Sequence, residues 1–218
     1  LPSMRDTRLY CATVLLKDGR LFVAGGEYGN GSATAEIYDP VNTNWTQINP
    51  PAALLDPAQG QTFGDSSAKI LRDGRVLIYP IIRSTNAPTL LYNPFTNGWT
   101  AGPNPVDAGE ATWVKLPDDS ILTLDADVSG PGGQACQRYI PSAGAGSWTN
   151  DATVPVDLWA HLACCYGEIG SALLQPDGKV IYMGGNGKTA IYTPSGSTSN
   201  GSWQIGPSLP AGLGMADT

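Results

Sequence analysis

The stretch Leu15–Gly26, LLKDGRLFVAGG, joins two hydrophobic runs through an Asp-Gly pair and ends in two glycines. Asp-Gly between hydrophobic runs is a strong signal for a β-hairpin, because glycine readily adopts the positive φ of a tight turn. We therefore expect a two-residue turn at Asp18–Gly19 between strands over residues 8–16 and 21–26. The terminal glycines indicate a place where another backbone comes close.

The same order of features recurs four times along the chain: a hydrophobic hairpin, then Tyr-x-Pro, then a single Trp. The turn acids are Asp18, Asp73, Asp118 and Asp177, the tyrosines are Tyr38, Tyr92, Tyr139 and Tyr192, and the tryptophans are Trp45, Trp99, Trp148 and Trp203. From turn Asp to Trp the separations are 27, 26, 30 and 26 residues. A period of roughly 50 residues built from short strands is typical of a β-propeller.

The repeat predicts an all-β protein with four four-stranded blades, at about 1–50, 51–104, 105–153 and 154–208, with 209–218 starting a further blade. The repeated Tyr and Trp residues are large and flat, so we expect a structural role in packing between blades rather than ligand stacking. In the third repeat Asp119 replaces the turn glycine, and Asp can tolerate left-handed geometry at some cost.

These motifs resemble the kelch repeat, in the variety related to the central propeller of galactose oxidase. The residues that carry the resemblance are Leu15–Gly26, Ala35–Pro40, Asn44-Trp45, Leu173–Gly185 and Tyr192–Pro194. Blades two and three depart from the pattern, with Tyr79-Pro80 and Asp125-Ala126 in place of the two glycines. Because kelch-type rings more often have six or seven blades, we expect a segment of a larger ring; a four-blade ring, or two copies completing one, is the alternative.

The resemblance also implies one enzymatic hypothesis, a copper-radical oxidase of the galactose or glyoxal oxidase kind. Such enzymes bind copper through two histidines and two tyrosines, one tyrosine being cross-linked to a cysteine. The pair Tyr10-Cys11 resembles the stretch around a copper-binding tyrosine of glyoxal oxidases. The sequence has one histidine, His161, so copper is expected only if further blades supply the missing ligands.

Charge and composition disfavour several classes of partner. The net charge is −7, and the 12 Lys and Arg residues are scattered. Nucleic acids and anionic membranes require a basic face, and no apolar run approaches the roughly 20 residues of a membrane span. We therefore expect neither nucleic acid nor membrane as a partner.

The four cysteines leave their redox state open. The sequence contains no C-x-x-C spacing, and this absence argues against a zinc site. Cys136 could form a disulfide with Cys164 or Cys165, and buried free thiols are the alternative. A low lysine content and three N-x-S/T sequons, at Asn30, Asn44 and Asn200, favour an extracellular, cell-surface or periplasmic location.

No catalytic residue is assigned from the sequence, and no cofactor is expected beyond a possible calcium. Asp125 and Asp127 are weak candidates for a metal site, because hard cations take oxygen ligands from such loops. They could also form the carboxylate pair of a hydrolase, although solvated loop acids are the simpler interpretation.

The leading hypothesis is a non-catalytic extracellular binding or assembly module that recognises a glycan or protein through loops on one propeller face. The candidate binding residues are Tyr28, Asn30, Arg83, Asp125, Asp127, Trp159 and His161. One alternative is a segment of a copper oxidase or another carbohydrate-active enzyme. Another is a structural subunit of an extracellular polymer, in which open blade edges pair between copies.

Overall fold

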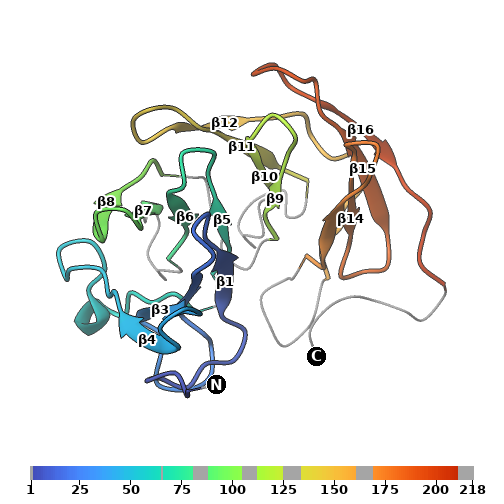
Figure 1. Cartoon of the computed structure of the whole chain (residues 1–218). Coiled ribbons are helices and arrows are strands. Elements are labelled where there is room, and N and C mark those ends of the chain that lie inside the picture. Colours follow the sequence, from blue (N-terminus) through green and yellow to red (C-terminus); the bar gives the residue numbers. More distant parts are fainter. Residues whose placement is uncertain are drawn as a thin grey trace. The chain divides into compact units, whose positions relative to one another are not determined.

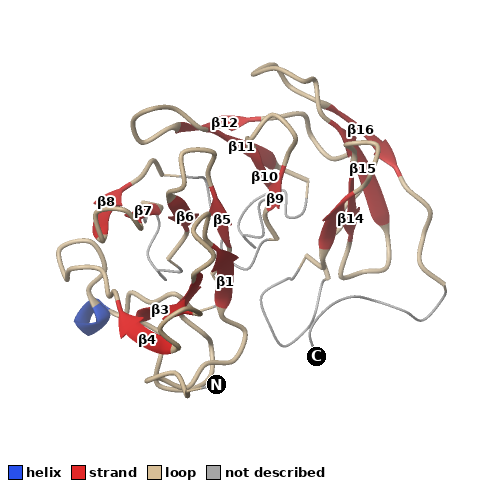
Figure 2. Cartoon of the chain, in the orientation of Figure 1, coloured by secondary structure: helices blue, strands red, loops and turns tan. Residues whose placement is uncertain are grey.

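The computed structural model describes residues 2–64, 66–80, 88–104, 112–124, 134–160 and 169–210. In these residues the regular structure is sixteen β-strands and one short 3-10 helix, η1 (Pro57–Gln59) (Figure 2). The all-β prediction is therefore confirmed. The chain divides into two compact units, Leu1–Asn104 and Pro105–Thr218, and each is described by itself.

The strands form four antiparallel sheets of four strands, each paired in chain order like a propeller blade (Figure 1). Blade 1 contains β1 (Ala12–Leu15), β2 (Leu21–Ala24), β3 (Ala35–Asp39) and β4 (Asn44–Gln47). Blade 2 contains β5 (Ala68–Ile70), β6 (Val76–Ile78), β7 (Leu90–Asn93) and β8 (Gly98–Ala101). Blade 3 contains β9 (Val114–Lys115), β10 (Ile121–Leu124), β11 (Cys136–Ile140) and β12 (Ser147–Asn150). Blade 4 contains β13 (Ala172–Leu174), β14 (Val180–Met183), β15 (Thr189–Thr193) and β16 (Ser202–Ile205).

The first strand is shorter than the sequence predicts. It begins at Ala12 instead of Arg8, because Tyr10 adopts a left-handed backbone with φ of 55° that interrupts the extended conformation. The residues before it leave the sheet and cross to the loop between β2 and β3, where Leu9 and Tyr28 form an isolated antiparallel bridge.

The hairpin turns also differ in one detail from the prediction. The amide of Gly19 donates to the carbonyl of Leu16 at 3.1 Å, and the amide of Leu16 donates to the carbonyl of Arg20 at 2.8 Å. Only Gly19 in this turn has a positive φ, 86°. The turn is thus a three-residue loop with one left-handed residue, because the two-residue type I′ turn would place Asp18 at positive φ as well.

The same turn occurs in all four blades, including blade 3, where the sequence has Asp119 in place of the turn glycine. Asp119 has φ of 76°, so it occupies the left-handed position that glycine fills elsewhere. In each turn the preceding Asp side chain accepts the amide two residues later at 3.0–3.1 Å. This local hydrogen bond fixes the turn independently of the rest of the blade.

Each repeated Tyr lies directly across from the repeated Trp of its own blade, on the third and fourth strands. The register pairs are Tyr38 with Trp45, Tyr92 with Trp99, Tyr139 with Trp148, and Tyr192 with Trp203. Their ring centroids lie 4.9–5.5 Å apart. Cross-strand aromatic pairs of this kind stabilise a sheet.

In each unit one of these pairs also packs against the preceding blade. Tyr92 and Trp99 of blade 2 contact Phe22 of blade 1, with centroid distances of 5.6 and 6.1 Å. Tyr192 and Trp203 belong to the hydrophobic cluster that joins blades 3 and 4. The structural role predicted for these aromatic residues is therefore found in both units.

The glycine pair at the end of β2 is required by a close backbone approach. Gly25 has φ of 71°, and a Cβ atom on it would lie 1.8 Å from the carbonyl oxygen of Phe63. A Cβ on Gly26 would lie 2.9 Å from the carbonyl oxygen of Leu9. The predicted crowding at this position is thus present, and it brings the segment before β1 against the loop after β2.

Candidate functional site

Three large apolar residues are exposed together beside the loop between β2 and β3. Leu9, Tyr10 and Tyr28 have exposed fractions of 52%, 54% and 57%, and we call them the tyrosine patch. The two tyrosine rings lie 6.1 Å apart in an edge arrangement. Exposed aromatic residues that cluster on a loop surface are typical of a recognition site, because they offer large contact area with few rotatable bonds.

The backbone of the tyrosine patch is held in a fixed geometry. The amide of Leu9 donates to the carbonyl of Tyr28 at 3.1 Å, and the amide of Glu27 donates to the carbonyl of Leu9 at 3.0 Å. Tyr10 keeps a left-handed φ of 55°, which is unfavourable for a bulky residue. Strained residues of this kind persist only where the surroundings enforce them, and they concentrate at functional sites.

The buried side chain of Arg8 holds the backbone next to the tyrosine patch. Arg8 Nη1 donates to the carbonyls of Gly25, Gly31 and Thr34 at 2.6–2.9 Å. Its Nη2 donates to Glu36 Oε1 at 2.9 Å, and neither side chain is exposed. A guanidinium carries several N–H donors, so one arginine can bond several strands and loops at once. These bonds hold Arg8 in place and thereby fix the residues that immediately follow it.

Asn30, one of the predicted binding residues, holds the segment before the patch through hydrogen bonds with Thr7. Its Oδ1 accepts hydrogen bonds from the Thr7 amide at 2.7 Å and from Thr7 Oγ1 at 3.1 Å. A Cβ atom on Gly29 would lie 2.3 Å from the carbonyl oxygen of Thr7. Asn30 thus positions the segment that carries Leu9 and Tyr10, while Tyr28 offers its exposed ring.

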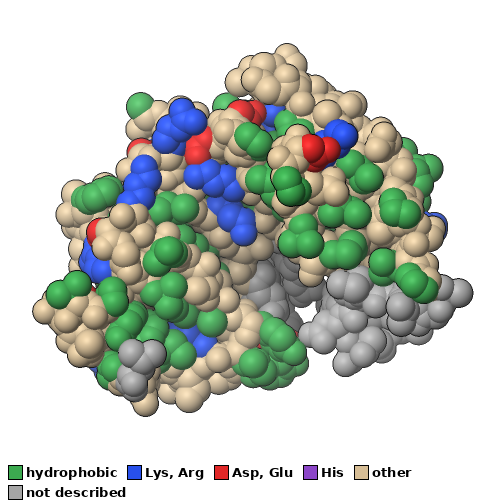
Figure 3. Space-filling model, turned by 45° about the vertical axis from the view of Figure 1, so that its right-hand side comes forward, with side chains coloured by type: hydrophobic (Ala, Val, Ile, Leu, Met, Phe, Trp, Pro, Cys, Tyr) green, Lys and Arg blue, Asp and Glu red, His purple; other side chains and the backbone are tan. Residues whose placement is uncertain are grey.

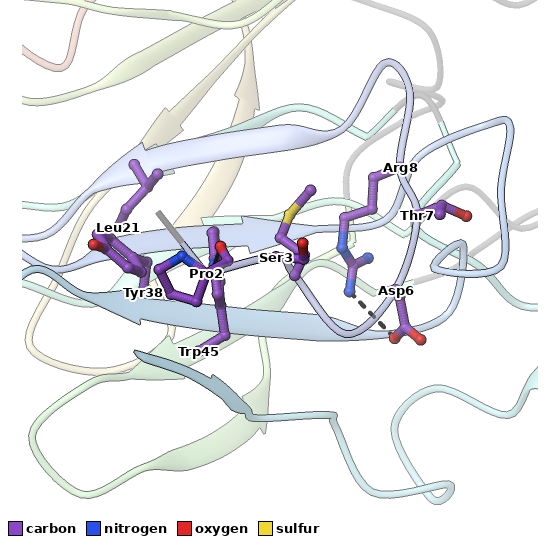
Figure 4. Close-up of a pocket in the computed structure, with 9 residues that line it drawn as sticks. Pro2, Ser3, Asp6, Thr7, Arg8, Leu21, Tyr38 and Trp45 are labelled. Carbon is purple, nitrogen blue, oxygen red and sulfur yellow. Dashed lines mark hydrogen bonds and ion pairs between the residues drawn. The ribbon is translucent and has the colours of Figure 1, made fainter. Parts of the chain in front are cut away.

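A groove of about 690 Å³ lies on blade 1. Its lining residues are Pro2, Ser3, Met4, Asp6, Thr7, Arg8, Leu21, Tyr38 and Trp45 (Figure 4). Figure 4 shows Leu21, Tyr38, Trp45 and Pro2 at one end, and Asp6, Thr7 and Arg8 at the other. Its aromatic end, formed by Tyr38 and Trp45, was predicted to pack between blades.

Of the remaining predicted site residues, the structure describes Trp159. Trp159 is half-buried and packs against the hydrophobic cluster of the second unit, with its amide donating to Asp157 Oδ1 at 2.8 Å. Arg83, Asp125, Asp127 and His161 lie outside the described residues. Tyr28 and Asn30 are the predicted binding residues that lie at the patch, whereas Arg8 and Leu9 were predicted only as part of the first strand and Tyr10 only as half of the pair Tyr10-Cys11.

The thiols that the structure describes are unpaired. Cys11 is half-buried, and Cys136 is buried. Burial raises the pKa of the Cys136 thiol far above its usual value, and the negative charge of Asp151 adds to this effect. Cys136 is thus held as a protonated, unreactive thiol, while its predicted partners Cys164 and Cys165 lie outside the described residues.

Imidazole, thiol and carboxylate groups do not cluster in the part of the chain that the structure describes. Among residues 2–64, 66–80, 88–104, 112–124, 134–160 and 169–210, no three His, Cys, Asp or Glu side chains converge to hold a metal ion.

In three of the hairpin turns the Asp side chain pairs with the basic residue two positions later. Arg20 pairs with Asp18 at 2.8 Å, Arg75 with Asp73 at 2.7 Å and Lys179 with Asp177 at 3.1 Å. On the face drawn in Figure 3, basic side chains lie beside acidic ones. The part of the chain that the structure describes holds no helix with the length and hydrophobicity of a membrane span.

Comparisons with known proteins agree with the blade architecture. The family model of the Kelch motif matches residues 8–52, which cover blade 1 and the start of the link that follows. No curated protein matches the chain in sequence.

Two solved structures share the fold. A fungal alcohol oxidase of the AA5 family, in complex with copper, is similar with a TM-score of 0.68 and 18% identity, over 96% of this chain and 44% of that one. A streptogramin B lyase is similar with a TM-score of 0.60 and 14% identity, over 97% of this chain and 58% of that one. The chain thus spans about half the length of these structures, and at such identities the likeness concerns the fold.

Proposed function

We propose that this chain, a kelch-repeat β-propeller protein, is a non-catalytic binding module that recognises a protein or glycan ligand outside the cell through the tyrosine patch. The observation that carries the proposal is that the side chains of Leu9, Tyr10 and Tyr28 are exposed while their backbone is held in a fixed geometry. All three side chains are more than half exposed. Their backbone is nevertheless held by buried Arg8 and by the Asn30–Thr7 hydrogen bonds.

Preorganisation of this kind favours binding, because little conformational entropy is lost when a ligand orders the surface. Tyrosine suits both proposed ligand classes. Its ring packs against apolar protein groups or the C–H face of a sugar, and its hydroxyl can exchange hydrogen bonds. The patch carries no lysine or arginine, so electrostatic attraction is not its main source of affinity.

The test compares the wild-type chain with a Tyr10→Ser/Tyr28→Ser double variant. Binding is screened on a glycan array and against extracellular proteins. A glycan or protein that binds the wild-type chain is then titrated by calorimetry. We expect the double variant to lose about 100-fold in affinity, since truncation of a central aromatic residue costs about 1–2 kcal/mol each.

The matched control is Val41→Ser, which removes an apolar side chain of 88% exposure on the turn between β3 and β4. It should bind as the wild type does. Equal affinity of the double variant and the wild type would refute the assignment of the patch.

A segment of a copper oxidase is the second candidate, because an AA5 alcohol oxidase shares the fold and Tyr10 precedes Cys11 at a strained backbone position. Copper measured by mass spectrometry, together with peroxide release from alcohols, aldehydes and sugars, distinguishes it. Stoichiometric copper or a cross-linked Tyr and Cys would favour the oxidase over the binding module.

A further inference from the structure

The hairpin turns of blades 1 and 2 carry charges that the turn itself does not require. The residue before the turn Asp is Lys17 in blade 1 and Arg72 in blade 2, whereas blades 3 and 4 have Pro117 and Pro176 there. All four turns nevertheless form the same pair of backbone hydrogen bonds. The repeats thus act as an internal control, and they show that a cation at this position is not needed for folding.

The same residue also packs on the turn glycine of the next blade in its unit. Lys17 Cδ lies 3.6 Å from the place that a Cβ atom on Gly74 would take, and Pro117 Cγ lies 3.6 Å from the equivalent place at Gly178. Proline therefore provides this packing without a charge. The ammonium group of Lys17 donates to the carbonyl of Arg72, and it forms no ion pair with a carboxylate among the described residues.

An exposed aromatic ring lies at the same place, on the turn between β7 and β8. Phe95 is 67% exposed, and its Cε2 and Cζ atoms lie 2.9 and 3.1 Å from the Cβ position of Gly74. The equivalent residue of blade 4 is Ser195, so an apolar ring is not required there either. We call Lys17, Gly74 and Phe95 the turn platform: a lysine stem and a ring on either side of a flat backbone.

Hydrogen bonds between blades 1 and 2 hold the turn platform in place. Arg20 Nη2 donates to the carbonyl of Pro94 at 3.1 Å, and the amide of Phe95 donates to Asn93 Oδ1 at 2.9 Å. Together with the bond from Lys17 to the Arg72 carbonyl, they connect the turns that carry the ring and the ammonium group. A ligand would therefore lose little conformational entropy in ordering this surface.

The turns around the platform are positively charged in a chain whose net charge is −7. The turns of blades 1 and 2 contain four basic and three acidic side chains, a net +1, and those of blades 3 and 4 contain one basic and three acidic, a net −2. The ranges counted are 17–20, 39–44, 72–75 and 93–98 in the first pair, and 117–120, 140–147, 176–179 and 193–202 in the second. Charge complementarity thus favours an acidic partner at the platform.

We propose that the turn platform binds an acidic segment of a partner protein. An apolar side chain of that segment packs on the Phe95 ring and on the methylene stem of Lys17, and a neighbouring carboxylate pairs with Lys17 Nζ. A protein fits better than a polysaccharide, because aromatic and arginine side chains are enriched at protein interfaces, and Arg20 and Arg75 follow in the same two turns.

This site is separate from the tyrosine patch. Tyr10 lies just before β1 and Lys17 just after it, so the two surfaces lie at opposite ends of the strand. The test therefore does not depend on what the tyrosine patch binds.

The experiment measures the binding of short fluorescent peptides by polarisation. The acidic probe has one Leu or Phe flanked by Asp and Glu, and the matched neutral probe has Asn and Gln in their place. We expect the acidic probe to bind at least about tenfold more tightly than the neutral one, with an affinity that falls as salt is added. Lys17→Glu and Phe95→Ser should each weaken its binding at least about tenfold.

The matched control is Lys179→Glu, which makes the same change of charge in the hairpin of blade 4. Because Lys17, Phe95 and Lys179 are exposed, their replacement leaves the fold intact. Lys179→Glu should bind the acidic probe as the wild type does, and so should Tyr10→Ser/Tyr28→Ser.

Three results would overturn the proposal. One is a wild-type chain that binds neither probe, or binds both equally. Another is an equal loss of affinity for Lys17→Glu and Lys179→Glu, which would indicate a general effect of charge. The third is retention of a uronic-acid or sulfated polysaccharide through Lys17 and Phe95 without binding of the acidic peptide, which would assign the platform to an anionic glycan.

Discussion

Arg8 Nη2 lies 2.9 Å from Glu36 Oε1, and both side chains are fully buried. Glu36 also accepts the backbone amides of Arg5 at 2.9 Å and Asp6 at 3.3 Å. This single carboxylate thus connects the segment before β1 to the third strand of blade 1. The geometry of the tyrosine patch depends on that connection.

Replacing Glu36 by Gln should destabilise the protein by about 3 kcal/mol, because the buried Arg8 guanidinium loses its nearer carboxylate, at 2.9 Å, and keeps only that of Asp6, at 3.5 Å. The control is Asp18→Asn, which breaks the Asp18–Arg20 pair in the first hairpin. There the side chains are 39% and 30% exposed, so the loss should stay below about 1 kcal/mol. Urea unfolding measures both, and equal losses would contradict a special role for the buried pair.

Gly25 and Gly19 provide a matched test of close packing at the end of β2. Both have left-handed backbones, with φ of 71° and 86°, so alanine at either site costs about 1–2 kcal/mol of backbone strain. A Cβ on Gly19 meets no atom within 4 Å, whereas one on Gly25 lies 1.8 Å from the carbonyl oxygen of Phe63. We expect Gly25→Ala to cost about 2–3 kcal/mol more than Gly19→Ala in free energy of unfolding. Similar losses would show that Phe63 does not approach β2 so closely.

Tyr192 should make the stability depend on alkaline pH. Burial raises its pKa from the usual value of 10.0, and its hydrogen bond to Asp151, of 2.8 Å, acts in the same direction. The folded protein thus keeps a proton that the unfolded chain releases, so the free energy of unfolding decreases as the pH rises above about 10.

The Tyr192→Phe variant isolates this contribution. At pH 7 it should be less stable than the wild type by about 1 kcal/mol, through the lost hydrogen bond. Between pH 10 and 12 the difference should shrink, because the variant has one titrating group fewer. Urea unfolding as a function of pH measures the effect, and a constant difference at all pH values would be inconsistent with it.

Much of the fold could be predicted from the sequence, because its signals are local and repeated. Asp18 and Gly19 mark a hairpin by their own conformational preferences, and Tyr38 and Trp45 follow it in an order that all four blades repeat. The turn geometry was predicted one residue too short, since Asp-Gly fits both a two-residue loop and a three-residue loop with one left-handed residue. The kelch resemblance is confirmed by the matching motif at residues 8–52.

The candidate site was predicted only in part, because its organisation depends on contacts between distant residues. Tyr28 and Asn30 were noted for their loop composition. Arg8 and Glu36 are 28 residues apart, and no local pattern shows that they meet. A charged residue inside the hydrophobic strand Ala35–Asp39 was the one available signal, and it did not indicate a partner.

The exposure of Leu15, at 67%, and of Leu173, at 59%, could not be predicted either. The same motifs recur in every blade, so the sequence does not distinguish an exposed position from its buried equivalents.

The most direct test of the central claim is the affinity of the retained protein or glycan for three forms of the chain: wild type, Tyr10→Ser/Tyr28→Ser and Val41→Ser. The account predicts about 100-fold weaker binding for the double variant alone, with all three forms equally stable to urea. Equal affinities for all three forms, or no ligand for the wild type among glycans and extracellular proteins, would contradict it.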